Sequence, residues 1–145
     1  MNEEQYAEWR KEHGDAPEWK HALIVMQWLE YLNPKTAFDY GCGEGFYTHW
    51  FNEFGVQCYG YEPNTEIVKR AYGQAIQTIT QMLIPQYNGA WDLVVCIDVL
   101  EHVTPEQEKE VIENLIKLSK KYILLSICDV TLWDVYKDPT HINCK

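Results

Sequence analysis

Positive charge is scarce in this sequence. Its 145 residues contain 12 Lys and Arg against 22 Asp and Glu, which gives a formal net charge of −10. Nucleic-acid binding depends on clustered Lys and Arg that neutralise phosphates, and a pair such as Lys120–Lys121 makes only a small basic patch. The composition therefore argues against nucleic acid as a partner, and against an anionic membrane surface for the same reason.

Long apolar runs and a cysteine framework are also missing. No stretch approaches the roughly 18 apolar residues that a membrane-spanning helix needs. The first residues, MNEEQYAEWRKEHGD, are polar and acidic, unlike a secretion signal. The five cysteines, at positions 42, 58, 96, 128 and 144, are odd in number and include no C-x-x-C pair. We therefore expect a cytoplasmic protein with reduced thiols and no membrane contact.

What the sequence does contain is a regular alternation of strand and helix patterns. Its length is typical of one domain, so we expect residues 1–145 to fold as a single domain. Strands are expected at 36–40, 56–61, 76–80, 91–96 and 122–127. Helices are expected at 3–12, from the capping signal Asp15–Glu18 to 32, after the glycines to 52, at 64–73, and from Thr104 to 120. This alternation predicts an α/β fold with a parallel sheet.

The stretch FDYGCGEGFYT, residues 38–48, follows the first expected strand and holds three alternate glycines, Gly41, Gly43 and Gly45. Glycines allow positive φ and close approach of a ligand, and the next helix offers its N-terminal N–H groups. Glu62 ends the second expected strand, where a carboxylate can accept hydrogen bonds from both hydroxyls of a ribose. Since parallel sheets bind ligands beyond the carboxyl ends of their strands, these residues predict a site for a ribose-containing ligand.

The spacing of these glycines differs from two familiar nucleotide motifs. The dinucleotide fingerprint G-x-G-x-x-G needs a glycine where this sequence has Phe46. The Gly-Lys-Ser/Thr of a phosphate-binding loop does not follow either. A nicotinamide-dependent reductase is therefore disfavoured.

Three segments, FDYGCGEGFYT, GYEPN and WDLVVCIDVLEHV, resemble class I S-adenosylmethionine-dependent methyltransferases of types 11 and 23, over about residues 19–143. The resemblance implies a Rossmann-like three-layer sandwich with strand order 3-2-1-4-5. It implies S-adenosyl-L-methionine as the cofactor, S-adenosyl-L-homocysteine as the product, and methyl transfer to a small-molecule acceptor, on oxygen. The alternative is a non-catalytic cofactor-binding module, or a partner subunit with an incomplete acceptor site.

The same resemblance gives roles to the residues of the glycine stretch. It implies that the backbone from Gly41 to Gly45 holds the methionine part of the cofactor and that Glu62 holds its ribose. Asp39 is expected to brace the loop. Cys42 belongs to the cofactor-binding stretch, and we interpret it as a small packed residue rather than a reactive thiol.

Two further cofactor contacts are implied by resemblance. Ile97, just past the fourth expected strand, lines the pocket at that position in the family. Relatives often have an acid after the third strand that meets the adenine amino group, but the stretch ITQMLIP has none here. Gln81 or a backbone group is expected to replace it. Residues 1–18 are expected to form an N-terminal helix or a lid, and residues 19–145 the cofactor-binding core.

A second group of candidates lies in the stretch DVLEHV. On a helix, Asp98, Glu101 and His102 would share one face as potential metal ligands. By resemblance, ubiquinone-biosynthesis and small-RNA 2′-O-methyltransferases bind a divalent cation with such a stretch, the latter with a later His, here His141. The Glu-His pair also occurs in the superfamily without a metal, and we do not favour a metal here. His102 or His141 is instead expected to act as a general base, with a purely structural His as the alternative.

The sequence after the fifth expected strand is short. Residues 128–145 are too few for the last two strands of the seven-stranded sheet that the resemblance implies. We therefore expect about five strands, with the apolar stretch 122–127 at an exposed edge. Such an edge favours association, so we expect either a homodimer through it or cover from the N-terminal segment.

Overall fold

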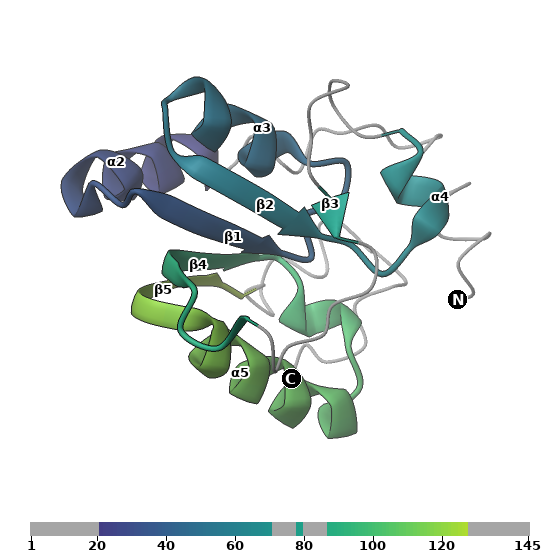
Figure 1. The fold of residues 1–145 in the computed structure, drawn as a ribbon. Coiled ribbons are helices and arrows are strands. Elements are labelled where there is room, and N and C mark those ends of the chain that lie inside the picture. The colour runs from purple at the N-terminus through teal and green to yellow at the C-terminus, as the bar shows by residue number, and fades with distance from the viewer. Residues whose placement is uncertain (1–20, 71–77, 80–86, 128–145) are drawn as a thin grey trace.

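A computed structural model describes residues 21–70, 78–79 and 87–127 of the chain. Within these ranges, five strands form one parallel sheet in the order β3-β2-β1-β4-β5 (Figure 1). The strands are β1 (Thr36–Tyr40), β2 (Gln57–Tyr61), β3 (Thr78–Ile79), β4 (Trp91–Ile97) and β5 (Ser119–Ser126). The predicted strand order and the parallel sheet are confirmed.

Helices cover both faces of this sheet. In Figure 1, α2 and α3 lie over one face, and α5 lies over the other. The described helices are α2 (Ala22–Leu32), α3 (Phe46–Glu53), α4 (Thr65–Val68) and α5 (Pro105–Leu118), with a 3₁₀ turn, η3 (Leu100–His102). The three-layer, Rossmann-like architecture is therefore confirmed for the described residues.

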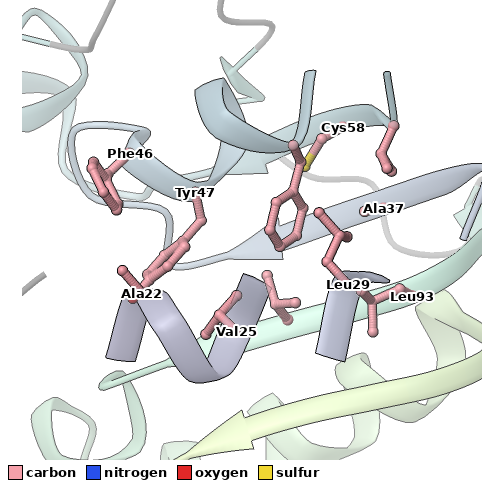
Figure 2. Close-up of a cluster of buried hydrophobic side chains, with 11 residues drawn as sticks. Ala22, Val25, Leu29, Ala37, Phe46, Tyr47, Cys58 and Leu93 are labelled. Carbon is pink, nitrogen blue, oxygen red and sulfur yellow. The ribbon is translucent and has the colours of Figure 1, made fainter. Parts of the chain in front are cut away.

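The two faces bury separate apolar clusters because side chains alternate along a strand. On β1, Ala37 belongs to the cluster under α2 and α3, whereas Phe38 belongs to the cluster under α5. Figure 2 shows the first cluster, in which Val25 and Leu29 of α2 face the sheet residue Leu93. This packing holds α2, before β1 in the sequence, and α3, after it, against the same face of the sheet.

The amino ends of the central strands are tied together by one carboxylate. Asp92 accepts a hydrogen bond from the Lys35 backbone N–H at 3.1 Å and contacts Lys121 Nζ at 2.9 Å. The backbone N–H of Asp92 donates to Thr36 Oγ1 at 3.0 Å. The hydrogen bond from Lys121, followed by that from Lys35, lowers the pKa of Asp92 below its ordinary value. This end of the sheet is thus closed by contacts within the protein.

The predicted boundaries around α5 are correct at its start and wrong at its end. Thr104 and Gln107 form the predicted capping box, with Pro105 in the first turn. The helix ends at Leu118 instead of residue 120, because β5 begins at Ser119 and pairs there with Trp91 of β4. Residues 119–121 therefore belong to β5. Helical periodicity predicts 119 and 120 in the helix and gives no element for 121.

The other helix predictions are met in part. α2 ends at Leu32, as expected, with Asn33 in the left-handed region and its N–H bonded to Leu29 O at 2.9 Å. The predicted start of α2 at Asp15–Glu18 and the predicted helix 3–12 lie outside the described residues. Within those residues, α4 spans only Thr65–Val68, where a helix over 64–73 was predicted. Its start is fixed by Asn64, whose side chain accepts from the N–H groups of Glu66 and Ile67.

β5 is the last strand of the sheet in the described part of the chain. Tyr122, Ile123 and Leu125 are 41%, 42% and 38% exposed, so the predicted apolar edge is present there. Self-association through this edge stays a prediction, and cover by the N-terminal segment concerns residues outside the described ranges. No described helix combines the length and the apolar character needed to cross a lipid bilayer.

Candidate cofactor site at the carboxyl ends of the strands

The glycine stretch forms a tight turn between β1 and α3. Gly41, Gly43 and Gly45 all have positive φ, at 76°, 55° and 83°. The N–H groups of Gly41 and Cys42 both donate to Tyr61 O, at 2.7 and 2.9 Å, so the turn is fixed to the end of β2. Two features exclude a side chain at position 41. Its positive φ disfavours residues other than glycine, and an added Cβ would lie 2.5 Å from Val99 Cγ2.

Asp39 lies behind this turn. It is only 2% exposed, and its Oδ2 accepts from the backbone N–H of Thr48 at 3.1 Å and from the Thr48 hydroxyl at 2.8 Å. These bonds join β1 to the first turn of α3, across the glycine stretch. Asp39 therefore holds the turn from the protein side, without facing the space above it.

Glu62 connects the turns that follow β1 and β2. Its carboxylate is buried, with Oε2 accepting from the Gly43 N–H at 3.1 Å and Oε1 accepting from the Asn64 N–H at 2.8 Å. A carboxylate has about four acceptor positions, and these two bonds orient it through one lone pair on each oxygen. The bond to Gly43 was not foreseen from the sequence, and it links the two motifs from which a ribose site was predicted.

A close contact between β2 and the glycine turn packs Cys42. An added Cβ at Gly60 would lie 2.6 Å from Cys42 Sγ and 2.7 Å from Thr48 Oγ1, so only glycine fits there. Burial, followed by the nearby charges of Asp39 and Glu62, raises the pKa of the Cys42 thiol far above its ordinary value. Cys42 is therefore a neutral, packed side chain, which agrees with its interpretation from the sequence.

The turn also carries a buried acid of its own. Glu44 is buried, and its Oε1 lies 3.4 Å from Nη2 of Arg70, just after α4. This ion pair fastens the middle of the glycine turn to the segment after β2. Two carboxylates, those of Glu44 and Glu62, therefore hold the turn in addition to the backbone contacts.

The end of β4 lies next to this turn, because β4 pairs with β1. Ile97 is the last residue of β4 and is partly buried against the cluster under α2 and α3. The next residue, Asp98, has a φ of 53°, in the left-handed region. Its Oδ1 accepts from the Ser126 hydroxyl at 2.7 Å and lies 3.2 Å from His21 Nε2. His21 and Ser126 were not identified from the sequence.

The three residues considered as potential metal ligands, Asp98, Glu101 and His102, do not share a helical face. Only Glu101 and His102 lie in the short turn η3, whereas Asp98 precedes it with a left-handed backbone. Glu101 is 2% exposed, and the carboxylate of Asp98 points to Ser126 and His21. Across the ranges 21–70, 78–79 and 87–127, no three His, Cys, Asp or Glu side chains are grouped as a metal site. A divalent cation at this stretch stays the interpretation that we do not favour.

The described structure brings together most, but not all, of the predicted site. Asp39, the stretch Gly41–Gly45, Glu62 and Ile97 gather at the carboxyl ends of β1, β2 and β4. Gln81, His141 and the expected lid at 1–18 lie outside the described residues. Gly60 was missed, although a glycine inside a strand signals close approach of another segment. A doubly wound α/β domain with its ligand site at this edge is the class that these features define.

Comparison with known proteins gives the family. The sequence profile of a family described as a methyltransferase domain matches residues 9–138. The chain therefore belongs to this methyltransferase domain family. It is 31% identical over 103 residues to the magnesium-protoporphyrin O-methyltransferase of Synechocystis, covering 65% of this chain and 44% of that protein. It is 35% identical over 88 residues to the norajmaline N-methyltransferase of Rauvolfia serpentina, covering 53% and 29%.

Solved structures share the fold of this chain. The magnesium-protoporphyrin IX methyltransferase of Synechocystis, solved with bound S-adenosylmethionine, aligns with a TM-score of 0.68 and 25% identity, over 83% of this chain and 69% of that one. A methyltransferase of Archaeoglobus fulgidus aligns with a TM-score of 0.66 and 22% identity, over 84% and 61%. The chain spans less than half the length of the curated relatives named above.

Proposed function

We propose that this domain binds S-adenosylmethionine and transfers its methyl group to the oxygen of a small-molecule acceptor. The observation that carries the proposal is the buried carboxylate of Glu62, held by the N–H groups of Gly43 and Asn64 at the edge where the glycine turn lies. Relatives named as O-methyltransferases support oxygen as the acceptor atom, although one relative is named as an N-methyltransferase.

The residues present fit this cofactor. In this proposal Glu62 accepts hydrogen bonds from the two ribose hydroxyls, and the bare backbone from Gly41 to Gly45 lets the methionine part approach closely. Ile97 offers an apolar surface at the end of β4. Gln81 stays our proposal for the adenine contact. When bound, the cofactor supplies a methyl group that is already electrophilic, so the chain's own task is to place a nucleophile about 3 Å from it and to accept a proton.

The candidate bases from the sequence remain His102 and His141. The N–H of His102 bonds to Val99 O at 2.9 Å, which places the residue in the turn directly after β4. Replacing each histidine by Ala separates them, because a general base contributes about 10²–10⁴-fold to the rate. A variant whose turnover is unchanged removes that histidine from the mechanism.

A cytoplasmic location and a homodimer through β5 also stay proposals.

Calorimetric titration with S-adenosylmethionine tests the cofactor. We expect micromolar binding by the intact chain, about 10-fold weaker or more in Glu62→Ala, because its charge-assisted contacts with the ribose hydroxyls are lost. Glu62→Gln is the matched control, since its amide oxygen can replace only part of the acceptor set. Equal affinity in all three proteins would contradict the proposed role of Glu62.

Release of S-adenosylhomocysteine with a panel of phenols, carboxylic acids and amines then tests the acceptor. Turnover with the phenols or acids and not with the amines supports transfer to oxygen. Tight cofactor binding without turnover on any member would instead favour the non-catalytic module.

A further inference from the structure

Three polar side chains from distant parts of the chain meet at the ligand-binding edge. His21 lies 77 positions from Asp98 and 105 from Ser126 in the sequence, yet its Nε2 is 3.2 Å from Asp98 Oδ1 and 3.2 Å from Ser126 Oγ. Asp98 follows β4, Ser126 ends β5, and His21 stands at the start of α2. No role for His21 or Ser126 follows from the glycine turn or from Glu62.

This cluster lies beside the cofactor site. β4 and β1 are neighbours in the sheet, so Asp98 emerges next to the glycine turn. Val99, directly after Asp98, fills the space that a side chain at position 41 would need, with Val99 Cγ2 2.5 Å from an added Cβ. The side chains of His21 and Asp98 keep 29% and 21% exposure, so a small molecule can reach them.

The contacts fix which nitrogen of His21 carries its proton. The Ser126 hydroxyl has one hydrogen and donates it to Asp98 Oδ1, at 2.7 Å. An ionised carboxylate only accepts, and a hydroxyl whose hydrogen is engaged can only accept as well. Both neighbours of His21 Nε2 are therefore acceptors, which requires the hydrogen on Nε2. In the neutral ring, Nδ1 is then the nitrogen with a free lone pair.

We propose that His21 is the general base of this domain, with Nδ1 accepting the proton of the acceptor hydroxyl, and that Asp98 and Ser126 position its ring. The inference rests on the proposed methyl transfer to oxygen. It is an alternative to His102 or His141 in the same role, and it rests on the contacts of the His21 ring.

The step is balanced in atoms and charge. The acceptor oxygen forms a bond to the methyl carbon, and the bond from that carbon to sulfur breaks with its electron pair left on sulfur. The hydroxyl proton moves to Nδ1, so the positive charge of the sulfonium is replaced by that of the imidazolium. The carboxylate of Asp98, 3.2 Å from Nε2, faces this new charge, and water then removes the proton.

The backbone at Asp98 supports a positioning role. A non-glycine residue at positive φ is uncommon and strained, and such positions cluster at functional sites. The left-handed turn is what carries the carboxylate from β4 toward Ser126 and His21. Asn tolerates the same backbone, so Asp98→Asn removes the charge without forcing the turn to change.

Steady-state kinetics on the phenols of the panel test the proposal in the full chain, because a carboxylic acid is already ionised at neutral pH and needs no base. We expect His21→Gln to lower kcat about 100-fold or more, with the dissociation constant of S-adenosylmethionine within about twofold of the intact chain. Asp98→Asn should lower kcat about 10-fold, and Ser126→Ala by less. His49→Gln, on α3, is the histidine control and should leave both values unchanged. Normal kcat in His21→Gln would overturn the inference.

A second measurement needs no acceptor. Two-bond ¹⁵N–¹H spectra of the histidine-labelled chain report which ring nitrogen holds the proton, with the His21 signals assigned by their loss in His21→Gln. We expect the Nε2–H form in the intact chain. An Nδ1–H form, or a mixture of both forms, would overturn the inference. This measurement still tests the inference when no acceptor of the panel is methylated. Failure of the intact chain to bind S-adenosylmethionine would instead reject the proposed function itself.

Discussion

The two ends of the sheet use buried carboxylates in different ways. At the amino end, Asp92 pairs with Lys121 and the Lys35 backbone N–H, so its charge is answered by a cation of the protein. At the carboxyl end, Glu62 accepts from the backbone N–H groups of Gly43 and Asn64, and these neutral groups orient it. A carboxylate is thus a clamp at the amino end, and Glu62 at the carboxyl end is held only by neutral groups in its described bonds, as suits the ligand role that we propose for it.

The turns differ in the same way. The segments before β1 and β4 are joined by direct contacts between Lys35, Thr36 and Asp92. Left-handed backbone occurs at both ends, at Asn33 and Gly89 before the strands and at Gly41 and Asp98 after them. The ends differ in space: an added Cβ would clash at Gly41 and Gly60 of the carboxyl end, whereas it would meet nothing within 4 Å at Gly89. Of Gly41, Gly55, Gly60 and Gly89, the two without room for a side chain therefore lie at the end where we propose the chemistry.

Removal of the Asp39 carboxylate should give the largest effect. Asp39→Ala leaves the buried N–H and hydroxyl of Thr48 without their acceptor, at a cost of about 3 kcal/mol in the free energy of unfolding. Urea unfolding of the full chain measures this. Asp39→Asn keeps an acceptor oxygen and should lose less. Equal stability of the Ala variant and the intact chain would show that the carboxyl end is not held as described.

A methyl group at position 60 should give the next effect. Gly60→Ala forces its Cβ against Cys42 Sγ and Thr48 Oγ1, and overpacking of this kind costs about 1–3 kcal/mol. Because Cys42 is part of the glycine turn, affinity for S-adenosylmethionine should fall as well. Gly55→Ala is the control, since an added Cβ there meets nothing within 4 Å, although its φ of +80° adds some strain. Affinity for S-adenosylmethionine separates the two variants, because only the change at position 60 should alter it.

The Asp92 clamp should give the smallest effect. Asp92→Asn keeps an acceptor for Lys35 and loses the pairing with Lys121, which is half-exposed and screened by solvent, so we expect about 1 kcal/mol or less. Since the pKa of Asp92 is lowered in the folded protein, its stabilisation is present above about pH 4 and is lost as the pH falls through the lowered value.

Urea unfolding at pH 7 and at pH 3 separates this contribution from other causes. The difference between the intact chain and Asp92→Asn should shrink at the lower pH. A difference that grows toward low pH would contradict the assignment.

Much of the fold was predictable because local signals and sheet order agree. The apolar strand at 91–96, the capping box at Thr104 and the glycine turn each indicate their element from nearby residues alone. The boundary between α5 and β5 was not predictable, because the side chains of 119–121 suit either a helix or a strand. Pairing with β4 determines where the helix ends and the strand begins. Local spacing also misled at Asp98, where a left-handed residue breaks the expected helical face.

The residues of the candidate site also differ in whether nearby sequence predicts them. Glu62 and the glycine turn carry a signal in residue type and spacing. His21 and Ser126 carry none, because a histidine at the start of a helix and a serine at the end of a strand are ordinary residues until the fold joins them to Asp98. Contacts that span most of the chain leave no trace in a short window of sequence.

The strand order also has a consequence during synthesis on the ribosome. β1 pairs with β2 on one side and with β4 on the other, and β4 begins at Trp91. About 50 residues separate the end of β1 from β4, so at about 5–20 residues per second one edge of the central strand waits several seconds for its neighbour. A nascent chain stalled before Trp91 is therefore expected to expose that edge to chaperones.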